Sequence, residues 1–111
     1  MGKNYHFQGF IYNPNQYDEQ WTLGEYVLTN SKYIRTSPKV AANNFVLVKN
    51  CRNDVKPKLV SQKPNDKAKL KIGSKVVITD FKYDSKDNLW GKMINSWICL
   101  YDSEPQAKRV D

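Results

Sequence analysis

The residue types that carry out enzyme chemistry are scarce in this chain of 111 residues. It has one histidine, His6, and two cysteines, Cys51 and Cys99, all far apart in the sequence. A Cys–His nucleophile pair or a histidine-bearing zinc site is therefore not expected. A glycosidase needs two facing carboxylates, but the candidate acids stand in predicted turns: Asp80, Asp84, Asp87, Asp102 and Glu104. We expect no catalytic residue, no metal site and no cofactor.

Two smaller features leave alternatives open. Cys51 and Cys99 lack the Cys-x-x-Cys spacing of zinc or redox sites. Cys99 lies in a predicted strand and is expected to pack as a small apolar side chain, and a disulfide between the two stays open. Residues 84–88, Asp-Ser-Lys-Asp-Asn, lack the length, central glycine and terminal glutamate of an EF-hand calcium loop. We expect a hairpin tip there, because Asp and Asn accept turn geometry.

Aromatic and basic residues are more plentiful than a small core requires. Seven Tyr and three Trp contribute to an aromatic content of 13%, so we expect some rings at the surface, where they can stack on sugars, bases or peptides. The net charge of +7 favours anionic partners such as nucleic acid, teichoic acid or an acidic membrane. Solubility alone would also explain this charge. We expect no signal peptide and no transmembrane segment, because long apolar runs are lacking.

Short strands must position these residues. The connection at Asn95 and Ser96 is short enough for a tight hairpin, and residues 80–88 are predicted to be a polar turn region. Closely spaced short strands with two tryptophans predict a small barrel rather than an enzyme core. We therefore predict an all-β fold, a small and partly open barrel of five to seven strands with little helix. The strands predicted in this region are 70–79, 89–94 and 97–101.

The chain is predicted to divide into three parts. Residues 1–25 form an N-terminal extension rich in aromatic and amide side chains, with no helical pattern. Residues 26–102 form the barrel. Residues 103–111 form a polar tail that we expect to fray.

Residues 49–69 are the least regular part of the barrel. They carry seven Lys and Arg against two Asp, and Pro57 and Pro64 disfavour a helix or a central strand. We predict a basic insertion between barrel strands, with an edge strand at 55–60. The other strands predicted in the first half of the barrel are 26–29, 33–36 and 45–49.

Four motifs of the barrel resemble those of a known family. They are Tyr-Ile-Arg-Thr-Ser-Pro at 33–38, Gly-Ser-Lys-Val at 73–76, Trp-Gly-Lys-Met at 90–93 and Trp-Ile-Cys-Leu at 97–100. Together they resemble the bacterial SH3-type (SH3b) cell-wall-binding domains of phage endolysins and autolysins, over about residues 26–102. The family usually has glycine before the second tryptophan, where this chain has Ser96. The hairpin there is also a residue shorter than is usual in the family.

The resemblance implies a non-catalytic module that binds peptidoglycan or teichoic acid and targets a phage endolysin to the Gram-positive wall. In the family, a groove between the first-strand loop and the distal loops binds wall peptide or glycan. A tyrosine face there could stack on a sugar or peptide plane, and an arginine could bind a carboxylate or phosphate. Alternatively, at least one of Trp90 and Trp97 is a core residue, and Tyr33 is a half-buried barrel residue. The ligand-binding positions implied are Tyr33, Arg35, Thr36, Tyr83, Asp84, Trp90 and Lys92.

Two other functions compete with wall binding. A small basic barrel with exposed aromatic rings could bind single-stranded nucleic acid. This alternative is weaker, because the lysines cluster in the Pro-containing insertion and are not interleaved with aromatic residues. A domain that recognises Pro-rich peptides would need acidic specificity residues, and the basic balance disfavours it.

The resemblance also implies partners and a place of action. Endolysins of this kind sometimes yield a free binding subunit by internal translation start, which assembles with the full-length enzyme. Such a subunit would be made in the host cytoplasm and act at the bacterial cell wall. We expect a homo-oligomer, because joining several weak sites raises avidity, and no membrane partner. The contact surface is predicted at aromatic residues of the extension: Phe7, Phe10, Tyr12, Tyr17 and Trp21.

Overall fold

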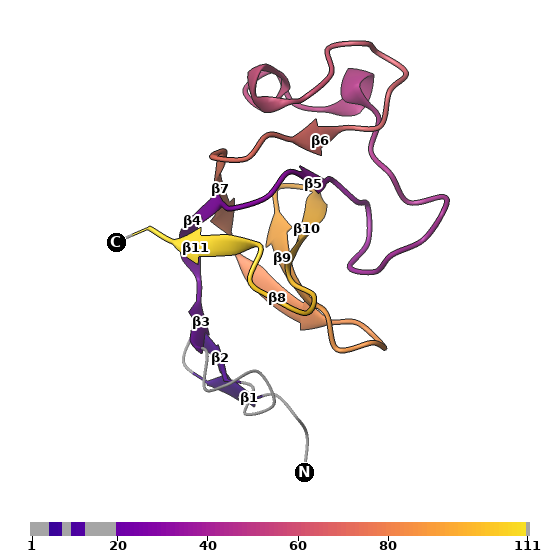
Figure 1. Ribbon diagram of the computed structural model, residues 1–111. Coiled ribbons are helices and arrows are strands. Elements are labelled where there is room, and N and C mark those ends of the chain that lie inside the picture. Colours follow the sequence, from indigo (N-terminus) through magenta and orange to yellow (C-terminus); the bar gives the residue numbers. More distant parts are fainter. Residues whose placement is uncertain (1–4, 8–9, 13–19, 111) are drawn as a thin grey trace.

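The computed structural model is all-β, which confirms the predicted fold class (Figure 1). It describes residues 5–7, 10–12 and 20–110, and side chains from residue 21 onward. Two 3-10 turns, η2 (Val48–Asn50) and η3 (Lys56–Lys58), are the helical elements of this part. No helix among the described residues is long and apolar enough to span a bilayer. The strands are β1 (Tyr5–Phe7), β2 (Phe10–Tyr12), β3 (Gln20–Thr22), β4 (Gly24–Leu28), β5 (Lys32–Tyr33), β6 (Lys69–Leu70), β7 (Lys75–Ile78), β8 (Asp80–Tyr83), β9 (Leu89–Met93), β10 (Ser96–Tyr101) and β11 (Ala107–Arg109).

These strands form small antiparallel sheets with the orders β1-β2-β3, β11-β4-β7, β8-β9-β10 and β5-β6. Only Thr79 separates β7 from β8, so one bent segment contributes to two sheets (Figure 1). Its first half pairs with β4 and its second half with β9. The sheets surround a core without closing into a barrel, because β7 pairs with β4 alone among the described strands.

Alternating burial along the strands builds the core. In β7, Val76 and Ile78 are buried while Lys75 and Val77 are exposed, as the period of two in a strand requires. In β9, Gly91 allows close packing: a Cβ there would lie 2.6 Å from Leu100 Cδ1 and 2.8 Å from Ile78 Cδ1. The bent β7–β8 segment therefore packs directly against the β9–β10 hairpin.

The number and bounds of the strands differ from the sequence prediction. Eleven strands are present in the described part rather than five to seven. The predicted run 70–79 breaks into β6 and β7 around a turn at Gly73, and further strands form in the predicted extension (β1 to β3), turn (β8) and tail (β11). The predicted turn 80–88 is wrong in its first half, where Phe81 is buried and β8 forms. The β9–β10 turn lies one residue early, at Ile94 and Asn95, since Met93 pairs with Ser96. Asn95 adopts a φ of 58°, which asparagine tolerates.

Trp21 contradicts its predicted place on an exposed oligomerisation surface. Its side chain is 3% exposed, stacks on Tyr26 at 5.6 Å and meets Tyr101 edge-on at 6.4 Å. Strand β4 also begins at Gly24, inside the predicted extension. The side chains of the other predicted contact residues, Phe7, Phe10, Tyr12 and Tyr17, lie outside the described part.

Residues 103–110 of the C-terminal tail do not fray, which corrects the prediction for this part of the chain. Ala107 is buried, and β11 pairs with β4 along its length. The Arg109 guanidinium donates to Thr22 Oγ1 at 3.1 Å and to the Leu23 carbonyl at 3.1 Å. This strand was missed in the polar sequence, because Ala107 is the one buried residue of β11.

The basic segment 49–69 is irregular, as predicted, but the edge strand at 55–60 is wrong. Turn η3 occupies its centre, and Pro57 sits at the start of this turn, where it is tolerated. Leu59, 1% exposed, anchors the segment to the core. Its end at β6 then pairs with β5, which brings Lys69 opposite Tyr33.

Candidate functional site

The segment Tyr33–Arg35 separates two hollows, because successive side chains of an extended chain point to opposite sides. Tyr33 and Arg35 line one hollow, which we call the Tyr33 pocket, and Ile34 lines the other, which we call the Val77 pocket. Each has a volume of about 300 Å³. The Tyr33 pocket includes Lys32, Tyr33, Arg35, Lys69, Trp90 and Asp102.

Three residues that the sequence suggested as ligand-binding lie together at the Tyr33 pocket. Tyr33 comes from β5, Arg35 from the segment after it, and Trp90 from β9. Asp84 lies behind them, because it is hydrogen-bonded to Trp90. Backbone bonds in both directions between Arg35 and Trp97 join the β5 segment to strand β10.

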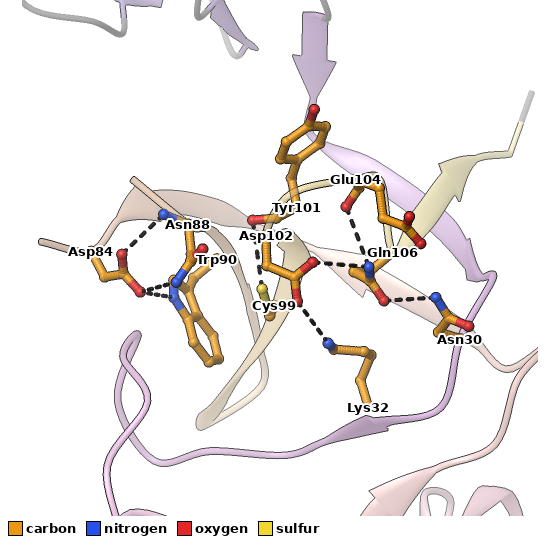
Figure 2. Close-up of polar contacts among 10 residues, drawn as sticks. All are labelled: Asn30, Lys32, Asp84, Asn88, Trp90, Cys99, Tyr101, Asp102, Glu104 and Gln106. Atoms are coloured by element: carbon orange, nitrogen blue, oxygen red, sulfur yellow. Dashed lines mark hydrogen bonds and ion pairs between the residues drawn. The ribbon is translucent and has the colours of Figure 1, made fainter. Parts of the chain in front are cut away.

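Asp84 organises the loop between β8 and β9 (Figure 2). Its Oδ2 accepts the Trp90 Nε1–H at 2.9 Å and the Asn88 amide at 3.0 Å, and its Oδ1 accepts two backbone N–H groups, of Lys86 and Asn88. Burial alone would raise the pKa of Asp84, but these hydrogen bonds outweigh it and hold that pKa below its usual value. The predicted hairpin tip at 84–88 is confirmed. Asp84 thus holds Trp90 in place.

Both tryptophans of the family-like motifs are core residues. Trp90 is 1% exposed and Trp97 is 9% exposed, and they form a buried cluster with Cys99. Trp90 therefore contributes a wall to the pocket and little open surface. Cys99 is free, as is Cys51, and burial raises the pKa of the Cys99 thiol to about 11.

Arg35 is held in place by other groups of the protein. Its Nη1 donates to the Ala41 carbonyl at 2.7 Å and to Asn44 Oδ1 at 2.9 Å, and its guanidinium lies 3.8 Å from the centre of the Phe45 ring. Burial lowers its pKa, although its value starts so high that the charge is retained. Arg35 thus fixes the loop between Arg35 and Phe45. Among the described residues, Nε and Nη2 have no hydrogen-bond partner.

The accessible part of the site is a set of aromatic rings beside cations. Tyr33 is 38% exposed and meets Phe45 edge-on at 5.1 Å. Lys69 Nζ lies 4.9 Å from the Tyr33 ring centre, and Lys67 Nζ lies 4.2 Å from that of Phe45. Sequence analysis missed Phe45, Lys67 and Lys69 as site residues. The alternation of Lys67, buried Ala68 and Lys69 was the available signal for a strand-like segment.

A polar network ties the rim of the Tyr33 pocket to the C-terminal tail (Figure 2). Lys32 Nζ lies 3.4 Å from Asp102 Oδ2, and Gln106 Nε2 donates to Asp102 Oδ1 at 3.0 Å. Asn30 Nδ2 in turn donates to Gln106 Oε1 at 2.9 Å. The tail that was expected to fray therefore supports this rim.

The three other predicted residues do not line the Tyr33 pocket. Thr36 Oγ1 makes a long contact of 3.4 Å with the Asn44 carbonyl in the adjacent loop. Tyr83 is partly buried against the main core. Lys92 is exposed on β9, where it pairs with Trp97 of β10.

The pocket suits non-covalent binding of an anionic or hydroxyl-rich ligand. Lys32, Arg35 and Lys69 line it against one acid, Asp102, which is already paired with Lys32. Among the described residues, no group of three His, Cys, Asp or Glu side chains could hold a metal ion. No protein-family model, curated protein or solved structure matches the chain.

Proposed function

We propose that this chain is a non-catalytic module that binds the Gram-positive cell wall and targets a phage endolysin to it. The proposal starts from the resemblance of its motifs to SH3-type wall-binding domains. The observation that carries it is the meeting of Tyr33, Arg35 and Trp90 at one pocket. These three positions belong to motifs 33–38 and 90–93, which the resemblance implies in ligand binding.

The chemistry of the pocket fits a wall polymer. The half-exposed Tyr33 ring can stack on the C–H face of a sugar or on a peptide plane. Lys69, beside this ring, can attract a phosphate or carboxylate group, and both are abundant in Gram-positive walls. Arg35 and Trp90 are buried and hydrogen-bonded, so they hold the pocket in shape before a ligand arrives.

A sedimentation assay on purified walls, with teichoic acid retained or removed, tests this proposal. Tyr33→Ala should weaken binding by about tenfold, the effect typical of a central aromatic contact. Ile72→Ser is the matched control, because Ile72 is 64% exposed and lies outside both pockets. Equal binding by wild type and Tyr33→Ala would contradict the assigned site. Loss of turbidity in a cell suspension treated with this chain alone would contradict the non-catalytic role.

A second candidate, binding of single-stranded nucleic acid, is favoured by one observation. Two lysines of the basic segment make cation–π contacts with aromatic rings, Lys67 with Phe45 and Lys69 with Tyr33. Cations beside exposed rings are the usual means of holding stacked bases and phosphates. A gel-retardation assay with single-stranded DNA at physiological salt decides between the two candidates. Tighter binding to DNA than to walls would favour nucleic acid.

Assembly with further copies or with a full-length endolysin is part of the proposal. It rests on the avidity gained when several weak wall sites are joined. Light scattering should give a multiple of 12.9 kDa for the intact chain. A monomer that still binds walls would remove assembly from the proposal and leave wall binding intact.

A further inference from the structure

The Val77 pocket is apolar inside and open at one side. Ile34, Leu70 and Val76 are buried at its base. Val77 and Ile94 also line it, and each is 59% exposed. Since exposed aliphatic side chains next to an apolar hollow are unfavourable in water, this region is a candidate interaction surface.

The hydrogen-bond register shows which way the backbone of β7 points. Thr29 N donates to the Gln106 carbonyl and Val110 N to the Glu25 carbonyl, so odd-numbered residues of β4 bond to β11. Even-numbered residues of β4 therefore bond to β7, which places Tyr26 opposite Val76 as a hydrogen-bonded pair. The amide and carbonyl groups of Lys75 and Val77 consequently point away from β4.

That outer edge of β7 is only partly covered. The Lys75 carbonyl accepts Lys58 Nζ at 3.0 Å, and Thr79 N donates to the Lys92 carbonyl at 2.9 Å. Val77 lies between them, and β7 has no second strand neighbour among the described strands. Strand β9 ends at Met93, too early to cover Val77. Within the described residues, the region between β7 and the end of β9 is thus a seam at which the backbone of Val77 has no strand partner on its outer side.

We propose that this seam binds an extended acidic polypeptide by strand addition. The partner would exchange backbone hydrogen bonds with Val77 and insert an aliphatic side chain into the Val77 pocket, since unpaired edges are templates for a further strand. The charges around the pocket favour an acidic partner. Lys58 and Lys75 outnumber Glu25 at the rim, while Arg52 and Asp54 form an ion pair and cancel each other. At this seam, an acidic segment is favoured over a second copy of this chain, because the copy carries a net charge of +7.

The seam is distinct from the proposed wall-binding site. It lies on the opposite side of the segment Tyr33–Arg35, and it uses backbone groups and aliphatic side chains, with Lys58 and Lys75 at its rim, instead of aromatic rings. Binding at the two sites should therefore be separable by mutation.

A titration of ¹⁵N-labelled protein tests this proposal, with a capped hexapeptide of alternating glutamate and valine as the probe. We expect chemical-shift changes at residues 75–77 and 94–96 that approach saturation by about 1 mM peptide. The same peptide with N-methylated backbone amides should not bind, because it lacks donors. A lysine–valine peptide should bind at least tenfold more weakly. Absence of shifts with the acidic peptide, or equal binding of the N-methylated one, would overturn the proposal.

Two variants check the location. Val77→Pro removes one outward N–H at an edge, where proline is tolerated, and Ile94→Ser removes apolar surface at the mouth without touching the strand. Each variant should bind the acidic peptide about tenfold more weakly than wild type and should bind walls as wild type does, with Ile72→Ser as the control. If Val77→Pro does not fold, Ile94→Ser decides. If the chemical shifts of the same residues change with protein concentration in the absence of peptide, the occupant is a second copy of the chain, and the proposal of an acidic partner is overturned.

Discussion

The Tyr33 pocket and the Val77 pocket are of similar size and flank the same three residues, yet they are built by different means. Each contains one arginine and one cysteine. In the Tyr33 pocket, Arg35 and Cys99 are buried and hydrogen-bonded to protein groups. In the Val77 pocket, Arg52 is exposed on the rim and Cys51 is half-buried against aliphatic neighbours.

The difference shows how one small domain can offer two kinds of surface. Buried polar groups that satisfy one another hold the Tyr33 pocket rigid, so few side chains remain available to a ligand. The Val77 pocket is shaped by aliphatic packing and retains an unpaired strand edge. The first suits a charged or hydroxyl-rich polymer, and the second suits an extended peptide. The following predictions test whether this contrast is real, from the largest expected effect to the smallest.

Asp84→Ala should be the most damaging change, because it leaves the buried Trp90 Nε1–H and two backbone N–H groups without their acceptor. We expect a loss of about 2–3 kcal/mol in the free energy of unfolding, measured by urea denaturation. Lys86→Ala is the control, since only the backbone of Lys86 contacts Asp84. Equal stability of the two variants would show that the polar framework does not hold the Tyr33 pocket.

The two arginines provide a direct comparison of the pockets. Arg35→Ala removes hydrogen bonds to Ala41 and Asn44 and the contact with Phe45, and should cost about 1–2 kcal/mol. Arg52→Ala breaks an exposed ion pair with Asp54 and should leave the urea midpoint unchanged. A larger loss for Arg52→Ala than for Arg35→Ala would reverse the assignment of the rigid and open pockets.

The two cysteines probe the same contrast chemically. Iodoacetamide at pH 8 should modify Cys51 at least tenfold faster than Cys99 in the folded protein, as measured by mass spectrometry of each peptide. Burial raises the pKa of both thiols, to about 11 for Cys99, and the reactive species is the thiolate. Denatured protein is the control, and there the two rates should agree. Faster modification of Cys99 would indicate that the Tyr33 pocket opens more readily than the Val77 pocket.

The smallest expected effect is the pH dependence of the stability that the charge of Asp84 contributes. The pKa of Asp84 is lower in the folded chain than in the unfolded chain. Between these two pKa values, the unfolded state therefore binds more protons than the folded state. The contribution of its charge is present above the unfolded pKa and is lost as the pH falls through the folded pKa. The stability difference between wild type and Asp84→Asn should therefore shrink below about pH 4. A difference independent of pH would mean that the charge of Asp84 does not contribute.

Some of this contrast could be predicted from residue patterns. The loop 84–88 was identified because its Asp and Asn residues favour a turn, and the hairpin of β9 and β10 was identified from two apolar runs with a short connection. Tyr33, Arg35 and Trp90 were also singled out before their common pocket was known. Such signals are local, since each depends on residues adjacent in the chain.

The sequence by itself determined the all-β class, because strand periodicity and turn residues act over a few neighbours. Only the tertiary structure decided that Arg35 points into the protein, that Lys67 and Lys69 lie over Phe45 and Tyr33, and that the polar tail forms β11. It also decided that β9 ends before it can cover Val77. The reason is physical: burial, ring–cation contacts and strand pairing join residues that are distant in the chain, and local composition carries no record of which distant partner each will meet.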